Sequence, residues 1–221
     1  MTGVYLEIGK RKVFACARDW PGWARAGRGE DAALSALEAA APRFAVVCAH
    51  AGVPFDSSSA VAHFEIVERV TGSATTDFGA LDACADLDRE PLTRQEAGRL
   101  AVLVEAAWNV FGQAAGAAPP TLRKGPRGGG RDRDAIVEHV LQTEVLHARM
   151  LGLRHRPFPP GDEAAAARMR AGILAAILAG EPAGQPPGPA RATRPPRFVA
   201  RRTAWHALDH AWEIQDRQGP A

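Results

Sequence analysis

The hydrophobic pattern divides this 221-residue chain into two parts, and that division constrains the fold more than any other feature. Up to about residue 72, short runs in which apolar and polar residues alternate, typical of half-buried β-strands, flank a stretch with helical spacing. From about residue 91 apolar residues recur every three or four residues in four long segments, which is typical of amphipathic helices. We therefore predict an α+β chain: an α+β domain over residues 1–72, a linker over residues 73–90 and a four-helix bundle over residues 91–217.

The first 72 residues contain a predicted hairpin and further short elements that together form a small α/β sandwich. Residues 4–8 and 12–17 are strand-like, and Gly9-Lys10 supplies the tight turn between them. The elements expected after the hairpin are a short strand ending near Ala26, a helix from about Glu30, a break at Pro42 and a strand over Ala62–Val70.

Residues 73–90 show no hydrophobic period, so they are predicted to be a linker. Four helices are expected after it: from the capping box Thr93/Glu96 to Pro119-Pro120, from Asp132 or Asp134 to near Gly152, over about Asp162–Ala179, and from near Phe198. The segment before the last helix is rich in proline and reads as a long extended connection. Four helices with such connections predict an antiparallel bundle.

Three histidines of the helical part form a candidate metal site. His206 and His210 are four residues apart, so their imidazoles lie on one face of the last helix and can reach one divalent metal. His139 interrupts a stripe that should point into the bundle, and a buried histidine with unpaired nitrogens costs roughly 1–3 kcal/mol. The other members of that stripe are Ile136, Thr143, Leu146 and Met150. We predict that His139, His206 and His210 bind one metal, and that His147 and His155 are poorer candidates.

Each of these histidines also has an ordinary alternative. Trp205, Leu208 and Trp212 could form the core face of the last helix, with His206 and His210 on a solvated face. His139 could be a core histidine that bonds a buried oxygen.

Two carboxylates accompany the histidines on the last helix. Three neutral imidazoles leave coordination positions open, as in a catalytic site, where a metal lowers the pKa of a bound water or thiol. Asp209 and Glu213 are the candidate catalytic residues, either as acid–base groups or as hydrogen-bond acceptors of the ligands, and the alternative is that they are solvated.

The glycine- and arginine-rich loop over residues 123–133 is a candidate substrate-binding segment. Its glycines permit close approach of the backbone, and it opens onto a helix N-terminus, which favours anions. We predict that Arg127, Arg131 and Arg133 bind an anionic part of the substrate on the order of 10 Å from the metal. The alternative is a flexible, solvated connection.

The helical part resembles the DinB/YfiT family of four-helix-bundle proteins. Two segments carry the resemblance, Ile136-Val137-Glu138-His139-Val140-Leu141 and Trp205-His206-Ala207-Leu208-Asp209-His210. The resemblance covers about residues 90–217 and implies a divalent metal, zinc foremost and otherwise nickel or iron, held by His139, His206 and His210. It also implies a metal-dependent transferase, isomerase or hydrolase that acts on a small molecule, in some members with a low-molecular-weight thiol.

The N-terminal part resembles the HicB-like antitoxin fold through two segments, residues 14–23 with the turn Asp19-Trp20-Pro21-Gly22 and residues 27–33. That resemblance implies a domain for contact with another protein, in which Trp20 and Trp23 are packing residues. It leaves open a second function class, a non-catalytic binding or stress-response module with the bundle as scaffold.

The charge balance excludes a strong electrostatic partner. The chain has 27 basic and 25 acidic residues and a net charge of +2, so neither a membrane surface nor nucleic acid is expected as a partner, and a small-molecule substrate is. Three cysteines at unrelated spacings, no signal-peptide pattern and no run of about 18 apolar residues favour a cytoplasmic protein. The oligomeric state is open, with a homodimer as one option.

Overall fold

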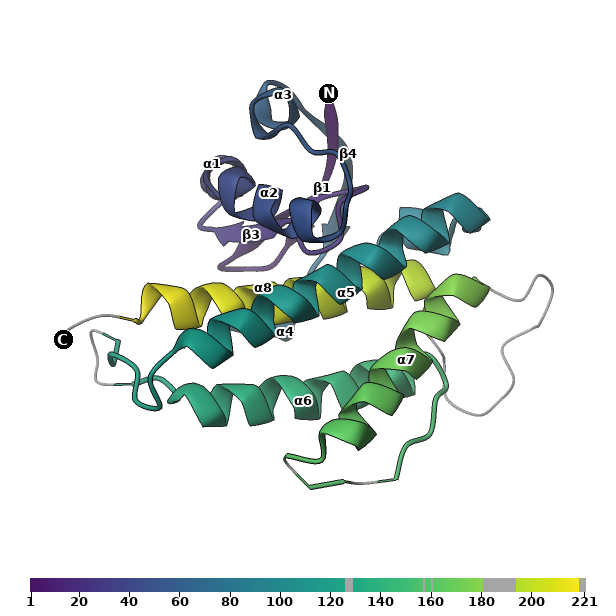
Figure 1. Ribbon diagram of the computed structural model, residues 1–221. Helices are drawn as coiled ribbons and strands as arrows, with labels where there is room; N and C mark the ends of the chain where they lie inside the picture. The colour runs from purple at the N-terminus through teal and green to yellow at the C-terminus, as the bar shows by residue number, and fades with distance from the viewer. Residues whose placement is uncertain (126–128, 157, 160, 181–193, 219–221) are drawn as a thin grey trace.

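A computed structural model describes residues 1–125, 129–156, 158–159, 161–180 and 194–218 of the chain. A four-stranded sheet forms the N-terminal part and long helices follow it, which confirms the predicted α+β class at this level (Figure 1). In Figure 1, the last helix (Pro196–Asp216) lies between the sheet and the helix over Arg133–Met150, with the helix over Arg94–Ala117 beside it.

The sheet has the strand order β3-β2-β1-β4. Its strands are β1 (Thr2–Ile8), β2 (Val13–Ala17), β3 (Ala24–Gly27) and β4 (Phe64–Thr71). The predicted hairpin is confirmed, since β1 and β2 are antiparallel and Ile8 pairs with Val13. Strand β4 is parallel to β1 and therefore needs a crossover, which the helices α1 (Glu30–Ala39), α2 (Ala41–His50) and α3 (Ser57–Val61) supply.

Pro42 marks a new helix. It lies in the first turn of α2, where a missing backbone N–H costs nothing, and the chain bends by 49° between α1 and α2. These two helices cover one face of the sheet with an aromatic cluster. Trp23 is fully buried, stacks on Phe44 with ring centres 5.7 Å apart and donates its indole N–H to the Leu37 carbonyl at 2.9 Å.

Strands β1 and β2 are buried on both faces, because α8 (Pro196–Asp216) covers the face opposite α1 and α2. Val4 and Leu6 belong to the core shared with α2, whereas Tyr5 and Phe14 pack on the α8 side, where Phe14 meets Trp205 edge to face. The two predicted domains thus share one continuous hydrophobic core.

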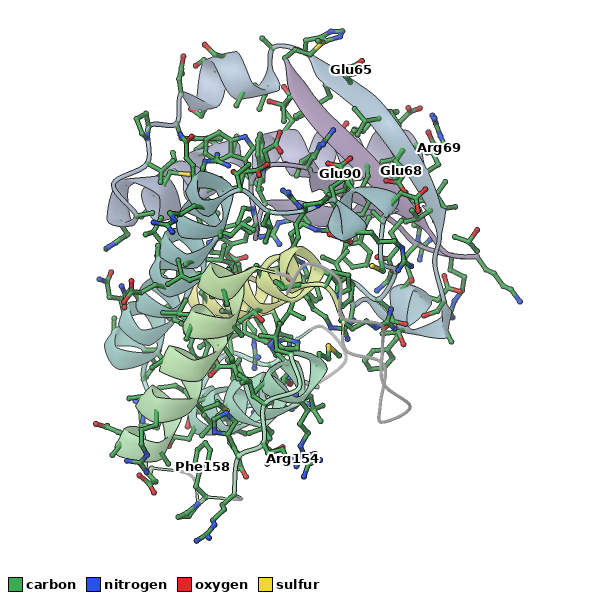
Figure 2. All side chains as sticks on the ribbon, turned by 90° about the vertical axis from the view of Figure 1, so that its right-hand side faces the viewer. Glu65, Glu68, Arg69, Glu90, Arg154 and Phe158 are labelled. Carbon is green, nitrogen blue, oxygen red and sulfur yellow. The ribbon has the colours of Figure 1, made fainter. Side chains whose placement is uncertain are left out.

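The open edge of the sheet is charged. Figure 2 shows Glu65, Glu68 and Arg69 along β4. Arg69 pairs with Glu30 at 2.9 Å, and Glu68 accepts a hydrogen bond from a backbone N–H. Charged side chains at an edge strand discourage pairing with a second chain.

The predicted linker is ordered and contains α4 (Ala74–Phe78) and a 3₁₀ turn, η1 (Asp86–Arg89), so the expectation of a stretch without structure is wrong. Buried Glu7 of β1 accepts hydrogen bonds from the Thr76 hydroxyl and the Asp82 amide. The hydrophobic period of residues 73–90 does not indicate these elements, because polar contacts with residues far away in the sequence hold the segment in place.

The four predicted helices of the C-terminal part are present: α5 (Arg94–Ala117), α6 (Arg133–Met150), α7 (Glu163–Ala179) and α8. Thr93 and Glu96 form the predicted capping box of α5, and Asp162 caps α7. The prolines of residues 181–193 lie outside the described residues.

Helices α5 and α8 pack together and run in the same direction, contrary to the antiparallel prediction. Arg197 at the start of α8 pairs with Glu96 at the start of α5, and Gln218 after α8 bonds the Ala114 carbonyl near the end of α5. Helices α6 and α7 both run in the direction opposite to α5 and α8 (Figure 1). They share one direction because the connection after α6 leads the chain back along the helices before α7 begins.

Helix α5 is the one described helix whose length and hydropathy would by themselves allow it to cross a membrane, and α1 with α2 pass the same test as a bent pair. In this fold α5 packs against α2, α7 and α8. Its apolar residues are those of a core helix.

Candidate metal centre

The three predicted histidines lie together between α6 and α8. His206 and His210 stand on successive turns of α8 and face α6, which brings His139 against them (ring centres 5.1 and 5.0 Å away). Trp205 and Trp212 lie on the side of the sheet and its helices. The alternative of a solvated histidine face does not occur, because His206 is only 9% exposed.

The spacing of the imidazole nitrogens fits a metal. Nε2 of His139 lies 3.3 Å from Nε2 of His206, and one nitrogen from each of the three rings falls within 4.8 Å of the other two. Nitrogens about 2.0–2.1 Å from a tetrahedral zinc ion are roughly 3.3 Å apart. The His139–His206 pair has that separation.

The surroundings of His206 and His139 favour the neutral imidazole, which is the form that binds a metal. Burial, and next the charge of His210, lowers the pKa of His206 to about 2. The same two causes lower the pKa of His139. A neutral imidazole can turn a lone pair toward a metal at the point where the rings meet.

Glu213 supports His210 from the side away from the cluster. Its Oε2 lies 2.8 Å from Nδ1 of His210, which leaves Nε2 of that ring for a metal, and its Oε1 accepts a hydrogen bond from Arg217 at 2.6 Å. The hydrogen bond with His210 is the main cause that lowers the pKa of Glu213. The geometry is that of an acceptor that orients a ligand.

Asp209 has a different neighbourhood from the one predicted. Its carboxylate pairs with Arg25 of β3 at 3.1 Å, and that guanidinium lies 3.8 Å above the Trp212 ring. Asp209 therefore belongs to the contact between α8 and the sheet. Its position within one turn of both histidines gave no indication of this partner, which is 184 residues away in the sequence.

The predicted substrate-binding arginines, Arg127, Arg131 and Arg133, do not share one environment. Arg133 donates to the Ala118 carbonyl at 2.9 Å and pairs with Asp134, so it joins α5 to α6. Arg131 is exposed, and its charge is close enough to contribute, after burial and His210, to the lowered pKa of His139. Arg127 lies outside the described residues.

The rest of the basic loop is tied to the end of α8. Lys124 pairs with Asp132 at 2.6 Å, and Arg123 exchanges hydrogen bonds with the backbone and side chain of Arg217. Because Arg217 also holds Glu213, the described part of this loop is connected to the histidine cluster through α8.

The prediction of which α6 residues point into the helical part was wrong in part. The buried face of α6 includes a fourth histidine, His147, which that prediction left out. Leu146 is 51% exposed, and the buried face contains Glu144 and His147 instead. A charged residue is an unexpected member of a core face, but Glu144 forms a bidentate pair with Arg170 of α7 at 2.8 and 2.9 Å. His147 is 1% exposed, with Nδ1 3.1 Å from the Thr203 hydroxyl.

Burial of His147 predicts a pH dependence of stability in the metal-free protein. Burial, and next the charge of Arg202, lowers the pKa of His147 to about 3, against about 6.5 in an unfolded chain. At a pH between these two pKa values, the unfolded chain binds more protons than the folded chain. The free energy of unfolding therefore falls as the pH falls below the pKa of His147 in the unfolded chain. From about pH 7.5 to about pH 5.5, this group is expected to lower the free energy of unfolding by about 1.4 kcal/mol.

Urea denaturation of the wild type and of His147→Gln at both pH values, with a chelator present, measures this loss. The variant is expected to show a pH effect smaller by that amount, since the contributions of the other histidines cancel in the comparison. Equal pH effects in the two proteins would contradict the assignment of a neutral, buried His147.

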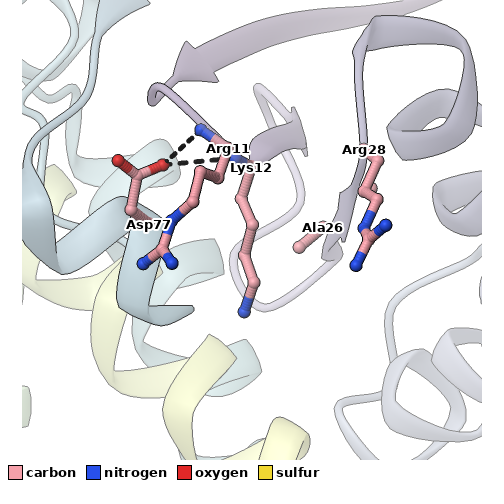
Figure 3. A pocket seen from close by; sticks show the side chains of 6 residues that line it. Arg11, Lys12, Ala26, Arg28 and Asp77 are labelled. Atoms are coloured by element: carbon pink, nitrogen blue, oxygen red, sulfur yellow. Dashed lines mark hydrogen bonds between the residues drawn. The ribbon is translucent and has the colours of Figure 1, made fainter.

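A pocket of about 520 Å³ lies on the N-terminal part, apart from the histidines. Arg11, Lys12, Arg28 and Asp77 line it (Figure 3). The Asp77 carboxylate accepts hydrogen bonds from the backbone N–H groups of Arg11 and Lys12, at 2.7 and 3.2 Å. The three cationic side chains give this pocket a positive balance.

Comparison of the chain with protein-family models, with curated proteins and with solved structures found no match.

Proposed function

We propose that this chain is a divalent-metal-dependent enzyme of the DinB-like type, which carries out thiol transfer, isomerisation or hydrolysis on a small anionic substrate in the cytoplasm. The observation that carries the proposal is the convergence of three imidazoles from two helices, with one nitrogen of each ring within 4.8 Å of the other two and the His139–His206 pair at the 3.3 Å that suits a zinc ion. Zinc is the first choice of metal, and nickel or iron would suit the same ligands.

The residues of the site have separate roles in this proposal. His139, His206 and His210 hold the metal, which supplies a Lewis acid that lowers the pKa of a bound water or thiol. Glu213 orients His210 through Nδ1. Arg131, exposed beside His139, attracts an anionic group of the substrate.

At the level of the fold, we propose that α5–α8 form a DinB-like four-helix bundle and that the sheet with α1 and α2 is a HicB-like domain. The pairing of α5 with α8 in one direction and of α6 with α7 in the other supports the first assignment. The hairpin followed by a short strand and a helix supports the second.

The second candidate is a non-catalytic binding module. The pocket lined by Arg11, Lys12 and Arg28 favours it, because a cationic pocket on the N-terminal part suits an acidic segment of a protein partner. In that case the histidines would bind no metal at physiological concentrations.

Metal binding separates the two candidates. Metal-free wild type titrated with Zn²⁺ is expected to bind one ion per chain, and His206→Ala is expected to weaken the affinity by at least about 100-fold, because it removes a ligand. His63→Ala is the matched control, since His63 is exposed and precedes β4. A wild type that stays folded and binds no Zn²⁺, Ni²⁺ or Fe²⁺ more tightly than His206→Ala would overturn the enzyme proposal.

A further inference from the structure

His206 has a second nitrogen that faces away from the metal cluster. Its Nε2 lies against His139, while its Nδ1 is buried and has no hydrogen-bond partner among the described residues. A metal at Nε2 fixes the proton on Nδ1, and a buried N–H without an acceptor costs free energy. The site therefore requires an acceptor beside Nδ1.

His147 is the neighbouring side chain that can supply this acceptor. Its ring centre lies 6.0 Å from that of His206, and the two rings are nearly perpendicular at 87°. Nδ1 of His147 contacts Thr203, but its Nε2 is buried and also unpartnered within the described part of the chain. Two unpaired nitrogens thus occur on adjacent rings in one buried layer between α6 and α8.

The contact with Thr203 is compatible with the tautomer that this role needs, because a hydroxyl can accept or donate. When Nδ1–H of His147 donates to the Thr203 hydroxyl oxygen, Nε2 carries the lone pair. One water at about 2.8–3.0 Å from each nitrogen would bridge the two rings. A buried water with two or more polar partners is an ordinary part of a protein interior.

We propose that His147 is a positioning residue of the metal site, which accepts the Nδ1–H hydrogen bond of His206 through one buried water. The inference rests on the proposed metal function and adds to it. Glu213 orients His210 in the same sense, so each histidine of α8 has its own acceptor, a carboxylate for His210 and an imidazole for His206. Such acceptors fix the ring orientation and raise the basicity of the ligand.

Zinc affinity tests the proposal without any substrate. His147→Leu is expected to keep one Zn²⁺ per chain but to weaken the affinity by about 10–100-fold, measured by competition with a chromophoric chelator. His147→Gln is expected to recover part of that loss, since an amide oxygen can accept the same hydrogen bond. Ile136→Val is the matched control, because Ile136 is buried on the same helix and bears no polar group, and its affinity is expected to be unchanged.

A second readout follows the proton itself. In nitrogen-detected NMR of the zinc-bound protein, Nδ1–H of His206 is expected to be protected from exchange in the wild type and to exchange faster in His147→Leu. If His147→Leu does not fold, Thr203→Val provides the same test, because it removes the hydroxyl that contacts Nδ1 of His147 and keeps the side-chain shape.

The outcomes distinguish the two proposals. A wild type without zinc affinity overturns the proposed function, and this inference with it. A wild type that binds zinc no more tightly than a folded His147→Leu, with equal protection of Nδ1–H of His206, overturns this inference alone.

Discussion

Asp88→Ala is expected to lower the free energy of unfolding by about 3–5 kcal/mol, because it leaves a buried arginine without its counter-charge. Asp88 is 1% exposed and Arg201 4% exposed. Their contact is bidentate, with Nε of Arg201 2.9 Å from Oδ1 of Asp88, and Arg201 also donates to the Tyr5 hydroxyl. The pair joins η1, β1 and α8, so its loss weakens the junction between the sheet and the long helices.

Denaturation in urea measures this change. The exposed pair of Glu30 and Arg69 is the control: water already solvates both groups, so Glu30→Ala is expected to have a much smaller effect. The double variant Asp88→Leu/Arg201→Met is expected to recover much of the lost stability, because no charge stays buried. A small effect of Asp88→Ala alone would show that water reaches Arg201 without unfolding.

Zinc at about 1,000 times its dissociation constant is expected to raise the free energy of unfolding by about 4 kcal/mol, because it binds only the folded chain. His139 lies 67 residues before His206, so the unfolded chain does not hold the three ligands together. At the same zinc concentration the gain is expected to fall to about 1.4 kcal/mol or less in His210→Ala, for a loss of affinity of at least about 100-fold, and to persist in His63→Ala.

The measurement compares denaturation curves with zinc and with a chelator at constant pH. A stability gain in His210→Ala as large as that of the wild type would mean that zinc binds elsewhere on the chain. No gain in the wild type would contradict the metal site itself.

Local signals were sufficient for the elements and for part of the candidate site. The capping box of Thr93 and Glu96 and the turn at Gly9 act within a few residues, so the sequence predicts where α5 begins and where the hairpin turns. The separation of four residues places His206 and His210 on one helix face in any fold. His139 was found because a histidine amid apolar residues requires a partner.

Contacts between distant residues had no such signal. Asp209 and Glu213 looked equivalent beside the histidines, yet one pairs with Arg25 of the sheet and the other with His210. The sequence does not indicate a buried His147, because it lies on the same face of α6 as the charged residue Glu144. Glu144 can be buried only because Arg170 of α7 pairs with it. The linker is ordered by Glu7 and Arg201, residues that no periodicity connects with it.

The sequence by itself thus determined the α+β order of elements, the ends of several helices and the two histidines of one face, because propensity, capping and side-chain period depend on neighbours in the chain. Only the tertiary structure decided that α5 and α8 run in the same direction, that His139 meets that face, and which carboxylate supports a ligand. The physical reason is that helix direction and partner choice follow from how apolar faces and buried charges are satisfied across the whole fold, where the paired groups are more than sixty residues apart for most of these contacts.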